Sequence, residues 1–221
     1  MKNGKLALFL AALLPLLVSV PAVAEIISGA VTGGTALTAG GIFVKLTPPL
    51  PNLFGPPDSV GNDNFQSPNL YGFDEDQNIL IGAVLGVDVG TAPAVGTTVA
   101  SHYIFFDPGP AQEVIGTVNF DSDVLAIITS TSNLAASDFL ANTGVNYLDP
   151  AERGLEAGDS VTISGPRQIL FDTVASSPGD YVRVITEFSP GTTAIPEPGT
   201  LPLLGVCLAA IAAFRYGRGA A

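Results

Sequence analysis

The central part of the chain alternates between short apolar stretches and turn-forming residues, and this rhythm limits the possible folds more than any other feature. The apolar stretches are rich in Val, Ile, Thr, Tyr and Phe, the residues that β-strands favour. The strands expected from this pattern cover residues 26–32, 41–47, 79–88, 97–106, 113–120, 124–130, 159–164, 168–174 and 181–188. So many short strands predict an all-β fold.

Proline and glycine separate these strands, most clearly at residues 108–110, 165–166 and 177–180. Each of these segments is suited to a turn because proline fixes φ and glycine accepts positive φ. The last three expected strands follow one another across such turns, which is typical of a meander. We therefore predict a β-sandwich, and a jelly roll is one arrangement that would fit.

Two segments break the strand rhythm. Residues 134–140 are expected to form one short helix, with Asn133 as its N-cap. Residues 48–78 begin with several prolines, which a central strand does not tolerate, so a long surface loop or an insertion is expected there. Three aromatic residues are expected to pack this segment: Phe65, Tyr71 and Phe73.

Charge is unevenly distributed along the chain. Residues 25–195 contain 4 basic and 19 acidic residues, a net charge of −15. Such a surface repels nucleic acids and anionic lipid headgroups, so DNA and RNA are excluded as partners. Divalent cations suit this surface better.

Few side chains could support catalysis or soft-metal binding. Cys207 is the only cysteine, so an intrachain disulfide cannot form, and His102 is the only histidine, which disfavours a zinc site. Ser101 and Asp107 could complete a Ser-His-Asp arrangement with His102, but the sequence has no nucleophile motif. We therefore expect His102 to be structural, and we assign neither catalytic nor cofactor-binding residues.

Clustered acids in expected loops are the candidates for a calcium site. Carboxylate oxygens are the ligands that calcium prefers. No segment matches the twelve-residue EF-hand loop, and a solvated acidic turn is the favoured alternative. The candidate ligands are Asp74, Asp76, Asp121 and Asp123.

The beginning of the chain has the order of a secretory signal. Lys2 and Lys5 precede an apolar run of 15 residues, 6–20, and small residues then occupy positions 22 and 24. This pattern predicts a signal peptide over residues 1–24, removed by signal peptidase, and an ectodomain over residues 25–190. A permanent anchor is disfavoured because the run is short for a transmembrane helix and contains Pro15.

The end of the chain combines three features. Pro196-Glu197-Pro198 precedes an uncharged apolar run of 15 residues, 200–214, which is followed by Arg215 and Arg218. This run is expected to be a short transmembrane segment, with the arginines on the cytoplasmic side. Residues 191–221 are therefore predicted to act as a separate sorting and anchoring region.

These terminal residues resemble the PEP-CTERM sorting signal, which exosortase processes in Gram-negative bacteria. The resemblance implies that exosortase recognises Pro196, Glu197 and Pro198 and cleaves near them, so the chain is a substrate and these residues catalyse nothing. Two prolines hold the segment extended, as a processing enzyme requires. Before processing, the tail would anchor the protein in the membrane.

The leading functional hypothesis is a non-enzymatic exported protein with a structural or adhesive role in the cell envelope or exopolysaccharide matrix. The main alternative is a carbohydrate- or calcium-binding extracellular module. The third is a carboxylate-dependent glycan hydrolase, because paired acids can cleave glycosidic bonds. The absence of tryptophan, which often binds sugars, argues against both sugar-directed alternatives.

Overall fold

The computed structural model describes residues 24–51 and 55–188. A four-stranded antiparallel sheet has the order β1-β8-β12-β11. Its strands are β1 (Ile26–Gly33), β8 (Gln112–Phe120), β12 (Gln168–Ala175) and β11 (Ser160–Gly165).

A seven-stranded sheet lies against the first and has the order β2-β4-β7-β13-β9-β6, with β5 also paired to β7. Its strands are β2 (Phe43–Lys45), β4 (Leu70–Asp74), β5 (Ile79–Leu80), β6 (Val89–Gly90), β7 (Thr98–Phe106), β9 (Val124–Ile128) and β13 (Asp180–Glu187). All its pairings are antiparallel except that of β2 with β4. The expectation of an all-β sandwich is confirmed.

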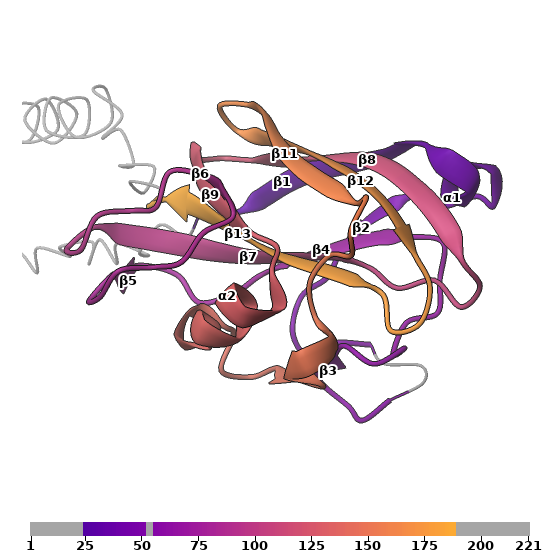
Figure 1. Cartoon of the computed structure of the whole chain (residues 1–221), viewed down its shortest axis with the longest axis horizontal. Coiled ribbons are helices and arrows are strands. Elements are labelled where there is room, and N and C mark those ends of the chain that lie inside the picture. The colour runs from indigo at the N-terminus through magenta and orange to yellow at the C-terminus, as the bar shows by residue number, and fades with distance from the viewer. Residues whose placement is uncertain (1–23, 52–54, 189–221) are drawn as a thin grey trace, which may run out of the picture.

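A third layer covers the outer face of the seven-stranded sheet, as Figure 1 shows. It contains the short parallel pair β3 (Ser59–Val60) and β10 (Asn146–Tyr147), helix α2 (Thr131–Ala136), and the 3-10 turns η1 (Asp138–Leu140) and η2 (Pro150–Glu152). Helix α1 (Gly34–Thr38) lies against β8 at one end of the four-stranded sheet.

Because of these layers, the central strands are buried on both faces. Nearly every residue of β7 and β13 is buried, whereas β8 alternates between buried and partly exposed residues. One apolar cluster fills the space between the sheets and includes Phe106, Phe171 and Val182. A second, richer in aromatic residues, lies under the third layer and includes Phe105 and Tyr181.

Two sequence-based expectations were wrong in detail. The segment 48–78 is not wholly a loop, because Leu70–Asp74 forms β4 and pairs with β7 in the middle of the sheet. Conversely, the expected strand 79–88 pairs only at Ile79–Leu80, and the chain then leaves the sheet edge.

The helix expectation also needs correction. There are two short α-helices among the described residues, and the N-cap of α2 is Ser130 rather than Asn133. The reason is Asp88, whose carboxylate accepts hydrogen bonds from the backbone N–H groups of Thr129 and Ser130 and from the side chains of Ser130 and Asn133. A distant carboxylate therefore takes the capping role that a local side chain was expected to have.

The predicted signal peptide and sorting tail are almost entirely outside the described residues, which start at Ala24 and stop at residue 188. The expected membrane segment 200–214 therefore stays a prediction. Within the described ranges, no helix has both the length and the apolar character that a bilayer crossing requires.

Candidate functional site

His102 lies on β7 between a carboxylate and a hydroxyl group. Its Nδ1 is 2.8 Å from Oδ1 of Asp74, and its Nε2 is 3.0 Å from Oγ1 of Thr186. This order of groups matches an acid–imidazole–hydroxyl triad, but His102 and Thr186 are fully buried and the imidazole packs 4.9 Å from the ring of Phe120. A substrate cannot reach this hydroxyl, so the arrangement holds β4, β7 and β13 together.

The structure does not bring Ser101 and Asp107 to His102. The Ser101 hydroxyl donates to Oε2 of Glu75 at 2.6 Å, and Asp107 accepts the backbone N–H of Phe65 at 3.0 Å. Neighbouring strand residues point to opposite faces, which explains why Ser101 and His102 have different partners.

The four calcium candidates from the sequence do not form one group of ligating atoms among the described residues. Asp74 contacts His102 and forms a 2.8 Å ion pair with Lys45. Burial opposes ionisation of Asp74, but the bonds from His102 and Lys45 outweigh it and lower its pKa. The other three have partners of their own: the N–H of Thr143 for Asp76, the N–H of Glu25 for Asp121 and the guanidinium of Arg167 for Asp123.

A buried ion pair occupies the outer face of the seven-stranded sheet. Arg183 on β13 donates to both carboxylate oxygens of Glu75, from Nε at 2.6 Å and from Nη2 at 2.9 Å. Glu75 also accepts the hydroxyls of Ser101 and Tyr147, each at 2.6 Å, and Arg183 reaches Oγ of Ser137 at 2.6 Å. Neither side chain of the pair is exposed, and their hydrogen bonds tie the third layer to the sheet.

A second polar cluster lies on the other side of β13 and consists of Glu156, Asp159 and Asp180. Each offers one carboxylate oxygen, and these three oxygens lie within 4.8 Å of one another. Glu156 and Asp159 come from the turn before β11, and Asp180 is the first residue of β13. Gly179 makes this placement possible, because its φ of +93° and the closeness of the Phe106 carbonyl leave no room for a side chain.

The three carboxylates differ in exposure and in partners. Glu156 is exposed, and Asp159 is partly exposed and accepts the backbone N–H of Val174 at 2.8 Å. Asp180 is fully buried, and neither of its carboxylate oxygens has a hydrogen-bond partner among the described residues. The Thr173 hydroxyl, on the inward face of β12, is 1% exposed and equally unpartnered.

The environment of Asp180 opposes its negative charge. Burial, above all, raises the pKa of this carboxyl to about 8, and the carboxylates of Glu156 and Asp159 raise it further. A buried group without a fixed cation nearby behaves in this way.

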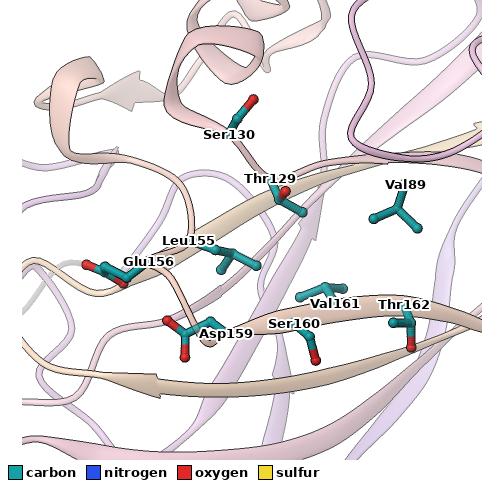
Figure 2. A pocket seen from close by; sticks show the side chains of 9 residues that line it. All are labelled: Val89, Thr129, Ser130, Leu155, Glu156, Asp159, Ser160, Val161 and Thr162. Carbon is teal, nitrogen blue, oxygen red and sulfur yellow. The ribbon is translucent and has the colours of Figure 1, made fainter.

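A pocket of about 310 Å³ opens beside the cluster and is lined by both Glu156 and Asp159. Figure 2 shows their carboxylates together at one end of the pocket, away from Val89 and Thr162. The pocket connects the exposed end of the cluster to solvent. Sequence reasoning missed this cluster; the only signals were two acids spaced three apart in a turn and an acid after Gly179.

Comparison with protein families identifies one feature, at the end of the chain. Residues 194–218 match the PEP-CTERM protein-sorting motif, a stretch that includes Pro196, Glu197 and Pro198. No catalytic family matches, and comparison with curated proteins and with solved structures gave no significant match. The motif implies an exported, surface-associated protein that exosortase processes. The chain thus carries a PEP-CTERM sorting motif and is consistent with a PEP-CTERM domain-containing protein.

Proposed function

We propose that this chain is a non-enzymatic exported protein that exosortase sorts to the cell envelope or exopolysaccharide matrix of a Gram-negative bacterium, where its β-sandwich has a structural or adhesive role. The observation that carries this proposal is the match of residues 194–218 to the PEP-CTERM sorting motif. Signal peptidase and exosortase are the expected processing partners, and exopolysaccharide is the expected contact of the mature protein.

Features of the ectodomain support a non-enzymatic role. The single imidazole of the chain is sealed between Asp74, Thr186 and Phe120, so it cannot act as a general base on a bound substrate. The buried pair of Arg183 and Glu75 is likewise closed to solvent. The acidic surface suits a protein that stays soluble outside the cell.

The sorting step is tested by expressing the full chain in a host with exosortase and in the same host without it. With exosortase, we expect a surface or released protein whose intact mass lacks Arg215 and Arg218. Replacing Pro196, Glu197 and Pro198 together by alanine should retain the tail and leave the protein in the membrane fraction. Pro190→Ala is the matched control, because it removes a proline outside the motif. Surface protein that retains Arg218 would contradict exosortase processing.

The role of the ectodomain is tested separately with the purified chain. We expect no turnover of a panel of glycans and esters, and retention of the protein on the matrix of wild-type cells but not on that of cells lacking exopolysaccharide. Turnover that Glu156→Gln abolishes would favour the carboxylate-dependent hydrolase instead. Binding to a glycan in calorimetry without turnover would favour the carbohydrate-binding module.

A further inference from the structure

We propose that Glu156, Asp159 and Asp180 form a binding site for a hard divalent cation, and that calcium is the ion that fits best. The site is distinct from the four acids that the sequence singled out, and it lies between the two sheets at the end where β13 begins. The proposal does not depend on the sorting function, because it concerns the folded ectodomain alone.

Within the part of the chain that the structure describes, Asp180 is buried without hydrogen-bond partners, and this is the first reason to place a cation beside it. A buried carboxylate without hydrogen bonds is costly, and native proteins nearly always pair such groups with a cation or with donors. Asp180 has 0% exposure, and both of its carboxylate oxygens are unpartnered among the described residues. They face the Thr173 side of the sandwich rather than solvent, since Asp180 and Val182 share the inward face of β13. A bound cation would satisfy these oxygens.

The distances between the three carboxylate oxygens suit one calcium ion. Calcium binds oxygen at about 2.3–2.6 Å, so two ligands on opposite sides of one ion are separated by about 4.8 Å. The three carboxylate oxygens lie within 4.8 Å of one another, so one ion can contact all of them after small side-chain adjustments. Three acids from two separate segments therefore bring their oxygens as close together as the ligands of one calcium ion.

A hydroxyl group and water can add further oxygen ligands to the three carboxylates. Calcium takes six to eight oxygens, more than three monodentate carboxylates provide. The unpartnered hydroxyl of Thr173, on the inward face of β12 in the opposite sheet, is one more neutral oxygen. The pocket beside Glu156 and Asp159 admits water, which can complete the sphere and gives the ion its path to the site.

The chemistry of the cluster selects against other metals. Zinc and copper favour nitrogen and sulfur ligands, and this cluster contains only oxygen. Magnesium requires a compact octahedron and keeps several of its waters, whereas calcium accepts irregular sets of protein oxygens. The net charge of −15 over residues 25–195 attracts divalent cations to the domain in general.

The test is calorimetric titration of CaCl₂ into the full-length chain after removal of metals with a chelator. We expect one calcium per chain with a dissociation constant of about 10⁻⁴–10⁻³ M, the range of extracellular calcium modules. If the dissociation constant is about 0.1 mM, 10 mM CaCl₂ should raise the melting temperature by about 5–10 °C over that in EDTA.

Three variants localise the binding. Asp180→Asn and Glu156→Gln should each weaken calcium binding tenfold or more and remove most of the thermal shift. Asp172→Asn removes the same charge from the neighbouring residue of Thr173 and should leave binding within twofold of the wild type. Glu156 is exposed, so its variant tests the site even if Asp180→Asn were to misfold.

Three results would overturn the proposal. The first is the absence of heat and of a thermal shift when calcium is added to the wild-type chain. The second is binding that persists unchanged in Glu156→Gln, which would place the ion elsewhere on the acidic surface. The third is an equal thermal shift with MgCl₂, which at the same concentration is the reference for non-specific screening.

Discussion

Two polar clusters lie on opposite faces of strand β13, and they differ in how completely the protein satisfies their buried groups. On the outer face, Arg183 and Glu75 bind each other and also form hydrogen bonds with Ser101, Ser137 and Tyr147. On the inner face, Asp180 has only like-charged carboxylates and an unpartnered hydroxyl around it.

This difference separates a structural network from a binding site. A network whose donors and acceptors are all used has no free group to bind a ligand. The network of Arg183 and Glu75 instead fixes the third layer on the sheet. A cluster with buried, unused acceptors and an excess of negative charge lowers the stability of the fold until something positive binds. The two clusters should therefore respond oppositely to mutation.

The largest expected effect is at the satisfied cluster. Glu75→Gln removes the closest counter-charge of the buried Arg183 and leaves it only the carboxylate of Asp138, at 3.3 Å. Breaking a buried ion pair in this way typically costs about 3–5 kcal/mol of the free energy of unfolding. Urea unfolding of the purified chain measures this loss. The double variant Glu75→Met and Arg183→Met removes both charges and should lose less stability than Glu75→Gln alone. Equal losses in the two variants would mean that the pair itself contributes little.

A substitution in the other cluster should raise the free energy of unfolding rather than lower it. Asp180→Asn should stabilise the calcium-free chain at pH 8 by about 2–3 kcal/mol. This is less than the full pKa shift would give at about 1.4 kcal/mol per unit, because the asparagine amide is itself costly to bury. A destabilised Asp180→Asn chain in EDTA would contradict the conclusion that this carboxylate is unsatisfied in the calcium-free fold.

The pH dependence of stability follows from the same group. The pKa of Asp180 is about 8 in the folded chain, above the unfolded value of about 3.9, so the folded state holds an extra proton between these values. The free energy of unfolding of the calcium-free chain should therefore fall as pH rises from about 4 to 8. Burial also raises the pKa of Asp107, to about 6, and adds to this trend. Thermal melting in EDTA should show the decline, and Asp180→Asn should flatten it.

Smaller effects are expected where a satisfied carboxylate is open to solvent. Asp88→Ala removes the bonds that hold the start of α2 and should cost about 1 kcal/mol, as the loss of a helix cap does. Asp123→Ala breaks only the exposed pair with Arg167 and should cost less stability than Asp88→Ala. Urea unfolding of both variants measures the difference, and a larger loss in Asp123→Ala than in Asp88→Ala would contradict this order.

The strand rhythm was enough to predict the fold class, because strands such as β8 and β12 alternate in a way that the sequence displays directly. Strand β4 escaped prediction because it is short and contains Gly72. The structure explains this glycine: a Cβ there would lie 2.7 Å from the side chain of Ile104 and 3.1 Å from that of Ile26. A residue that weakens strand propensity was thus required for packing between the sheets.

The candidate cation site could not be predicted from local patterns. Asp180 lies in a Ser-Pro-Gly-Asp turn that predicts solvent exposure, yet its side chain is fully buried in the folded chain. Its partners Glu156 and Asp159 are contributed by a different turn. The sequence-based candidates were instead acids adjacent in the chain, such as Asp74 and Asp76, and adjacency does not make side chains converge.

The most direct test of this contrast is an anomalous difference map from crystals of the full-length chain grown with calcium and soaked in Tb³⁺, a calcium substitute with strong anomalous scattering. We expect a peak between Glu156, Asp159 and Asp180, and none in the network of Arg183 and Glu75. A map without a peak at this cluster, or with its strongest peak beside Asp74, Asp76, Asp121 or Asp123, would contradict it.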